Sequence, residues 1–115
     1  GFHSECMRPA ADRLAAARAD TDLQPPSVPV VSNVTASPVT TVDEVRTTLA
    51  AQVCAPVLWE RSMRWALDAG HRTFLEPAPG TILAGIFRKI DPEAEVVAVS
   101  RPDEVEGALE RVGAS

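Results

Sequence analysis

The sequence lacks the short motifs by which several classes of enzyme are recognised. No Gly-x-Ser-x-Gly pattern occurs among its 115 residues, so the chain contains no serine nucleophile elbow. Neither of the common glycine-rich phosphate-binding patterns is present, so nothing indicates a nucleotide site. Histidine, cysteine, aspartate and glutamate nowhere cluster at the spacing of metal ligands. Any chemistry in this chain must therefore depend on isolated side chains.

Long apolar runs and basic clusters are absent too. No apolar run approaches the roughly 18 residues that a membrane helix needs, and no signal peptide is recognisable. The formal net charge is −5, and ten of the eleven basic residues are scattered arginines. This distribution offers no electrostatic footprint for nucleic acid. We therefore expect a globular α/β chain with neither a nucleic-acid nor a membrane partner.

The chain has little cysteine. Cys6 and Cys54 are isolated from each other and from any Cys-x-x-Cys or metal-binding spacing. We predict that both are buried free thiols, because unpaired cysteine packs as a small apolar residue. Free thiols are typical of a reducing compartment, which favours a cytoplasmic location.

Periodic segments alternate along the chain, separated by turns rich in proline. Helical spacing of apolar residues predicts helices over residues 7–19, 41–54, 59–69, 81–90 and 103–112. Short apolar runs predict buried strands over residues 28–33, 73–76 and 96–99. Thr41 and Glu44 have the spacing of a capping box, and Gly70 is a natural residue to follow a helix end.

This alternation indicates a parallel sheet of about three strands with helices on both of its faces. So few parallel strands leave sheet edges that must be covered. The helix over residues 81–90 is nearly all apolar and is expected to be buried on most sides. The sequence therefore predicts part of a larger α/β domain, and we expect the natural protein to extend upstream of Gly1.

Two histidines and one acidic residue are candidates for acid–base chemistry. His3 precedes a predicted helix and could be catalytic or structural, whereas His71 follows Gly70 and reads as a solvated turn residue. Glu76 ends a predicted strand and could act as a general base or cap the next helix.

Two turn residues have a functional and a structural interpretation. Gly80 could bring the backbone close to a ligand at a helix N-terminus, although a tight strand–helix turn is the simpler interpretation. Asn33 could hydrogen-bond across a site or hold a local Asx turn, and the turn is the simpler interpretation there too. Gln52, late in a predicted helix, has no signal of its own.

Several segments together resemble one family. They are Phe2-His3-Ser4 with Met7-Arg8-Pro9-Ala10-Ala11; Pro29-Val30-Val31-Ser32-Asn33-Val34-Thr35; Gln52-Val53 with Pro56-Val57-Leu58-Trp59; and Glu76-Pro77-Ala78-Pro79-Gly80 with the helix that follows it. In this order and spacing they are similar to hallmarks of the malonyl-CoA:acyl carrier protein transacylases, which share a fold with the acyltransferase domains of polyketide and fatty acid synthases. The resemblance covers almost the whole chain. Ala78 departs from it, because the family usually has glycine there.

The resemblance implies a fold. Family members have a large α/β-hydrolase-like subdomain with a small ferredoxin-like subdomain inserted into it. Residues 1–115 would form the C-terminal portion of the large subdomain. The half that carries the nucleophilic serine and the ferredoxin-like subdomain would both be absent from this chain, which alone is expected to be inactive.

The resemblance also implies chemistry. His3 would be the catalytic base, oriented by the backbone carbonyl of Gln52, in the transfer of a malonyl group from malonyl-CoA to the phosphopantetheine thiol of an acyl carrier protein. Phe2, beside it, would contact the substrate and favour malonyl over methylmalonyl units by filling the space of an α-methyl group. Asn33 is a weaker substrate-binding candidate. No bound cofactor or metal is expected.

Two other functions are compatible with the sequence. The chain could belong to an acyltransferase domain of a polyketide synthase, with the same chemistry in another pathway. It could also be a non-catalytic α/β interaction module. Fatty acid biosynthesis is the interpretation favoured here.

Overall fold

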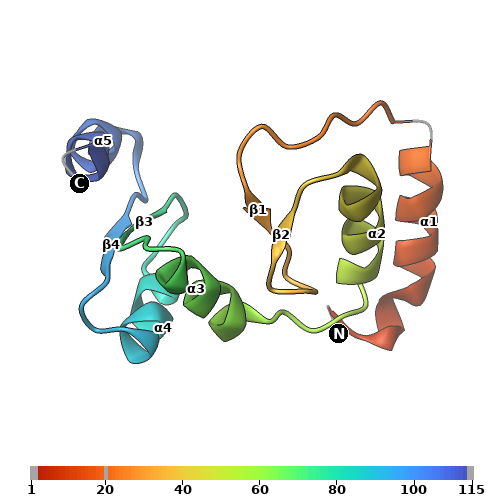
Figure 1. Cartoon of the computed structure of the whole chain (residues 1–115), viewed down its shortest axis with the longest axis horizontal. Coiled ribbons are helices and arrows are strands. Elements are labelled where there is room, and N and C mark those ends of the chain that lie inside the picture. Colours follow the sequence, from red (N-terminus) through yellow and green to blue (C-terminus); the bar gives the residue numbers. More distant parts are fainter. Residues whose placement is uncertain (1–2, 20, 114–115) are drawn as a thin grey trace. The chain divides into compact units, whose positions relative to one another are not determined.

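The computed structural model describes residues 3–19 and 21–113, and the chain divides into two compact units, residues 1–62 and 63–115. Figure 1 shows the elements in chain order. The mixture of helices with short strands agrees with the predicted α/β class. No helix among the described residues is long and apolar enough to cross a membrane.

The first unit is built around two helices. A 3₁₀ turn, Glu5–Met7, leads into helix α1 (Arg8–Ala19), and helix α2 (Val42–Gln52) lies beside α1 (Figure 1). Both helices were predicted, with boundaries that differ by one or two residues. Pro9 is the second residue of α1, where its missing N–H leaves no intrahelical bond unmade.

The strand predicted over residues 28–33 is much shorter and is paired differently from the prediction. Strand β1 (Val30–Val31) forms an antiparallel pair with β2 (Pro38–Val39), whereas we had predicted a buried parallel strand. Pro29 has no N–H to donate to a ladder, and Val28 and Val30 are 66% and 48% exposed. A short loop is enough to join β1 to β2, because antiparallel strands do not need the long crossover connection that parallel strands require.

The loop of this hairpin is held by its own backbone and by one hydroxyl group. The N–H of Ala36, which has a φ of 53°, donates to the carbonyl of Ser32 at 2.8 Å. The Oγ of Ser32 accepts from the N–H of Val34 at 3.2 Å. The side-chain turn that we had assigned to Asn33 as the simpler alternative is therefore made by its neighbour Ser32.

The second unit contains the parallel pair of strands. Strand β3 (Thr73–Glu76) pairs in parallel with β4 (Glu95–Ala98), and helix α4 (Ile82–Ile90) connects them. The rings of Phe74 and Phe87 pack with centroids 4.5 Å apart, and Phe87 is only 2% exposed. A short 3₁₀ turn, Pro102–Glu104, precedes the last helix, α5 (Val105–Gly113).

Helix α3 (Trp59–Asp68) ends as its sequence predicted. Gly70 adopts a φ of +93°, which costs glycine little because it has no Cβ. Its N–H donates to Leu67 O, and the N–H of His71 donates to Ala66 O, both at 3.0 Å. These two bonds form a Schellman motif, which satisfies carbonyls that the helix end would leave free.

Two predictions about burial are wrong for the described residues. Cys6 is exposed and Cys54 is only half-buried, although both are free thiols as expected. In α4, Ala84 and Phe87 are buried, but Ile82 and Ile86 are 74% and 42% exposed. The nearly continuous apolar sequence of α4 calls for more covering surface than the described residues of this unit provide.

The capping box of α2 leads to a prediction about pH. Glu44 Oε2 accepts from the backbone N–H groups of Thr40 and Thr41, and Glu44 N–H donates to Thr41 Oγ1. The hydrogen bonds that the carboxylate accepts lower the pKa of the Glu44 carboxyl below its usual value of 4.5, and the bond from the Thr40 N–H is the largest cause. A lowered pKa means that the carboxylate stabilises the fold above pH 4.5, and that this contribution is lost as pH falls through the folded-state pKa.

We therefore expect Glu44→Ala to lower the unfolding midpoint at pH 7, with the difference from the parent chain narrowing as the solution is acidified below the usual pKa of 4.5. Thermal unfolding of both proteins across this pH range measures the effect. Asp43→Ala, one residue away in the same exposed first turn, is the matched control. An equal difference at every pH would contradict the prediction.

Candidate functional site

His3 has an unusual backbone conformation. Its φ is 58°, in the left-handed region that residues with a Cβ seldom occupy. Such a conformation costs about 1–3 kcal/mol and persists only where surrounding contacts maintain it. The next residue, Ser4, is extended, and the 3₁₀ turn that leads into α1 follows at once. Strain of this kind is enriched at functional sites.

The His3 side chain is bonded to the end of α2. His3 Nδ1 lies 2.8 Å from the backbone oxygen of Gln52, which is the last residue of that helix. The last four carbonyls of a helix have no intrahelical partner, so the Gln52 oxygen is free to accept a bond from outside. The structure thus brings together two residues that are 49 positions apart in the sequence.

The partner of Nδ1 determines the tautomer of the ring. A carbonyl oxygen can only accept, so the hydrogen of the neutral imidazole must be on Nδ1. Nε2 then carries the lone pair and is the nitrogen that can accept a proton. The Gln52 carbonyl that accepts from Nδ1–H lies at the C-terminal end of α2, which is the negative end of the helix dipole. In chemical terms, the exposed imidazole has the fixed orientation and the free nitrogen that a general base needs.

An apolar groove lies next to this pair. A cavity of about 440 Å³ between α1 and α2 is lined by His3 and Gln52, by Arg18, and by apolar side chains. The apolar side chains that line it include Met7, Leu14, Leu49 and Val53. The proton-accepting nitrogen is therefore close to a surface that suits apolar groups.

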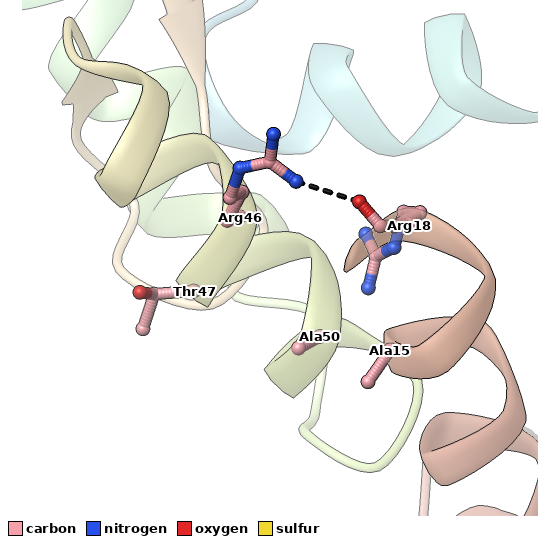
Figure 2. A pocket seen from close by; sticks show the side chains of 5 residues that line it. All are labelled: Ala15, Arg18, Arg46, Thr47 and Ala50. Carbon is pink, nitrogen blue, oxygen red and sulfur yellow. Dashed lines mark hydrogen bonds between the residues drawn. The ribbon is translucent and has the colours of Figure 1, made fainter. Parts of the chain in front are cut away.

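The same two helices are joined a second time, far from His3. Figure 2 shows a smaller cavity, of about 240 Å³, lined by Ala15, Arg18, Arg46, Thr47 and Ala50. Arg46 Nη1 donates to the backbone oxygen of Arg18 at 2.6 Å, and Arg46 Nη2 donates to that of Thr21 at 2.7 Å. Sequence reasoning missed Arg46. A signal was present, because Arg46 directly follows Val45, and Val42, Val45 and Leu49 have the helical spacing of an apolar face.

Glu76 caps a helix, which was one of its two predicted roles. The carboxylate is buried, with 6% of the residue exposed, and its two oxygens accept from the N–H groups of Leu83 and Ala84 at 3.0 and 2.9 Å. Both oxygens are thus used at the N-terminus of α4. The adjoining turn is closed by Gly80, with a φ of 90°, whose N–H donates to Ser100 Oγ at 3.1 Å. The simpler, structural interpretation of Gly80 agrees with this geometry.

The remaining candidates are dispersed. Asn33 is half-buried, and its backbone oxygen accepts from the N–H of Leu58 at 2.9 Å. His71 is exposed, as expected for a turn residue. Phe2 lies outside the described residues, so the predicted malonyl selectivity stays a prediction. No group of three potential metal ligands is found among the residues that the structure describes.

An α/β chain that presents a histidine held by a backbone carbonyl, without a serine nucleophile elbow, has the features of one part of a serine-dependent acyltransferase. Known proteins agree with this class. The chain is 36% identical over 109 residues to the malonyl CoA-acyl carrier protein transacylase of Bacillus subtilis, an alignment that covers 95% of the chain and 34% of that protein. It is 37% identical over 116 residues to the polyketide biosynthesis protein ThaF of Burkholderia thailandensis, covering 99% of the chain and 10% of that protein.

Solved structures lead to the same family. An acyl-carrier-protein-S-malonyltransferase from Bartonella henselae matches with a TM-score of 0.90 and 30% identity, over 97% of the chain and 36% of that structure. A malonyl-transacylase in complex with a type II polyketide synthase acyl-carrier protein matches with a TM-score of 0.89 and 30% identity, over 96% of the chain and 36% of that structure. No family model matches. Over almost its whole length the chain is similar to malonyl CoA-acyl carrier protein transacylases, and it spans about a third of the length of these relatives.

Proposed function

We propose that this chain supplies the general base to a malonyl-CoA:acyl carrier protein transacylase of fatty acid biosynthesis, acting in the cytoplasm. Its two free cysteines are compatible with that reducing compartment. The observation that carries the proposal is the 2.8 Å bond from His3 Nδ1 to Gln52 O, which leaves Nε2 free to accept a proton. The nucleophilic serine would come from the remaining two thirds of the enzyme, because the chain has no nucleophile elbow of its own.

In the first half-reaction, His3 Nε2 would take the proton of the serine hydroxyl as the serine oxygen attacks the malonyl thioester. Collapse of the tetrahedral intermediate breaks the carbon–sulfur bond, and the imidazolium returns the proton to the departing thiolate of coenzyme A. The Gln52 carbonyl accepts the Nδ1 hydrogen throughout and is ready to stabilise the charged ring.

In the second half-reaction, the same nitrogen would deprotonate the phosphopantetheine thiol of the carrier protein. The thiolate attacks the malonyl-serine ester, malonate becomes thioester-linked to the carrier, and the serine recovers its proton from His3. Every proton transfer in the proposed mechanism uses His3 Nε2, and no step of it needs a cofactor bound to this chain.

Exposed apolar surface supports the proposal that further chain completes the domain. In the second unit, Ile82 and Ile86 of α4 are one helical turn apart, and Val105 and Leu109 of α5 repeat that spacing. Their exposed fractions are 74%, 42%, 44% and 59%. Parallel strands such as β3 and β4 are ordinarily covered on both faces. We propose that residues 1–115 form the C-terminal portion of the large acyltransferase subdomain, with the nucleophile half and the ferredoxin-like subdomain packing around it.

The test is to complete the enzyme. In a chimera, this chain replaces the corresponding third of the Bacillus subtilis transacylase, and both the chimera and the isolated chain are exposed briefly to malonyl-CoA. We expect intact mass to show a malonyl adduct on the chimera only, and acyl carrier protein to remove it. A folded chimera that forms no adduct would contradict the proposal and favour the non-catalytic module.

The polyketide alternative has a specific observation in its favour, because relatives include a polyketide biosynthesis protein. The chemistry is identical, so the carrier protein is the discriminating variable. Transfer from the acylated chimera to carrier proteins of fatty acid and of polyketide synthesis should be compared at equal concentration. We expect faster transfer to the carrier of fatty acid synthesis.

A further inference from the structure

Arg46 bonds to the C-terminal end of α1 from the neighbouring helix. Its two terminal nitrogens donate to the carbonyl oxygens of Arg18 and Thr21, at 2.6 and 2.7 Å. Arg18 is the penultimate residue of α1 and Thr21 lies two residues beyond the helix. Arg18 O also accepts from the N–H of Thr21 at 3.1 Å, so the guanidinium adds bonds from α2 to a chain end that is otherwise bonded locally. A cation at that end also interacts favourably with the helix dipole. Figure 2 shows the first of these bonds crossing between the two helices.

The two polar links between α1 and α2 lie at opposite ends of α1. His3 precedes the start of α1 and is bonded to Gln52 at the end of α2, whereas Arg18 is near the end of α1 and is bonded to Arg46 in the first half of α2. The helices therefore run in opposite directions. Arg46 and Gln52 are six residues apart, which is about 9 Å along a helix at a rise of 1.5 Å per residue.

The side chains of α1 and α2 leave two open grooves between the helices. Ala15 and Ala50 face the smaller cavity of about 240 Å³, and neither is large enough to interdigitate deeply with the opposite helix (Figure 2). The groove next to His3 adds a cavity of about 440 Å³. Because interlocking side chains normally determine how two helices lie against each other, an interface with such gaps depends more on its polar links.

We propose that Arg46 is a positioning residue for His3. It anchors the C-terminal end of α1, and so keeps His3, which precedes the N-terminus of α1, at bonding distance from the Gln52 carbonyl. A helix bonded at one end only can pivot about that end. Even a small displacement at His3 would lengthen the 2.8 Å bond. The catalytic consequence rests on the proposed function, whereas the structural consequence can be measured on this chain alone.

The structural test determines the tautomer of the histidines by ¹⁵N NMR of the 115-residue chain, at a pH at which both imidazole rings are neutral. In the parent chain we expect His3 to carry its hydrogen on Nδ1. In Arg46→Ala we expect a shift toward the Nε2–H form, which imidazole ordinarily prefers when no acceptor holds Nδ1–H. His71, exposed in a turn, is the internal control and should not change. Arg13→Ala, an exposed arginine of α1, is the matched control variant.

The catalytic test uses the active chimera. We expect Arg46→Ala to lower kcat by about 10–100-fold with little change in KM, since a misplaced base slows the chemical step without removing substrate contacts. Arg46→Lys, which keeps a cation able to donate to these carbonyls, should recover part of the loss. If Arg46→Ala does not fold, Arg46→Lys is tested in its place. A lysine variant that has lost both carbonyl bonds, yet keeps the tautomer and kcat of the parent, would overturn the inference.

The two proposals can fail separately. An inactive parent chimera with a tautomer shift in Arg46→Ala would contradict the proposed function and leave the positioning of His3 by Arg46 supported. An active parent chimera, with a folded Arg46→Ala that matches it in both tautomer and kcat, would overturn the role of Arg46 while the proposed function stands.

Discussion

Replacing His3 by alanine is expected to reduce malonyl transfer by the completed enzyme about 10³- to 10⁴-fold, because in the proposed mechanism both half-reactions use the same nitrogen as general base. The loss should fall on kcat, since in the proposed mechanism His3 transfers protons in the chemical step and does not bind the substrate. Steady-state transfer from malonyl-CoA to the carrier protein measures it. Intact mass should show slow formation of the malonyl-serine ester as well as slow discharge.

Two further variants at this position and one at the other histidine separate chemistry from folding. His3→Asn keeps a residue that tolerates the left-handed φ of 58°, and it should lose as much activity as the alanine variant with less effect on stability. His3→Gly removes the backbone strain and the base together, so it should be inactive and no less stable than His3→Ala. His71→Ala, at the other histidine, should leave activity unchanged. An active His3→Asn enzyme would refute the role of His3 as the base.

Replacing Glu76 by alanine is expected to cost about 2–4 kcal/mol of unfolding free energy, because the N–H groups of Leu83 and Ala84 would lose their acceptors at a buried helix N-terminus. The loss of a negative charge at the positive end of the α4 dipole contributes to the same effect. A loss of this size is a large fraction of the stability of a typical domain, about 5–15 kcal/mol. Denaturant unfolding measures it.

Hydrogen exchange tests whether the effect of Glu76 is local. The amides of Leu83 and Ala84 should lose protection in Glu76→Ala before amides of α1 and α2 do. Glu76→Gln retains one acceptor but places an NH₂ group near the helix N–H groups, so its cost should be intermediate. Glu93→Ala, at an exposed position of the same unit, is the control. A Glu76→Ala chain as stable as this control would show that the two bonds contribute little.

Local signals in the sequence predicted the elements whose ends are held by neighbouring residues. The capping box of Thr41 and Glu44 begins α2, and Gly70 ends α3 with a positive φ. Strand β3 has the predicted bounds, residues 73–76. At the two helix ends the stabilising bonds join residues a few positions apart, so the sequence contains the whole interaction, whereas β3 was predicted from its apolar composition and pairs with the distant β4.

Elements that depend on distant partners were predicted less well. The run from Val28 to Asn33 has the composition of a buried strand, yet only Val30 and Val31 are paired, in an antiparallel hairpin. Pairing partner and exposure are properties of the sheet, and composition alone does not reveal them. The exposed Cys6 and Ile82 show the same limit, because burial depends on which surfaces the rest of the fold provides.

The candidate site divides in the same way. The sequence by itself determined that the chain has no nucleophile elbow, and it identified His3 and Gln52 through a family resemblance and not through any spacing between them. Only the tertiary structure decided that the His3 ring bonds to the Gln52 carbonyl, that Glu76 caps α4, and that Arg46 joins the far ends of α1 and α2. The physical reason is distance along the chain: His3 and Gln52 are 49 residues apart, and a bond between them exists only once two helices have packed.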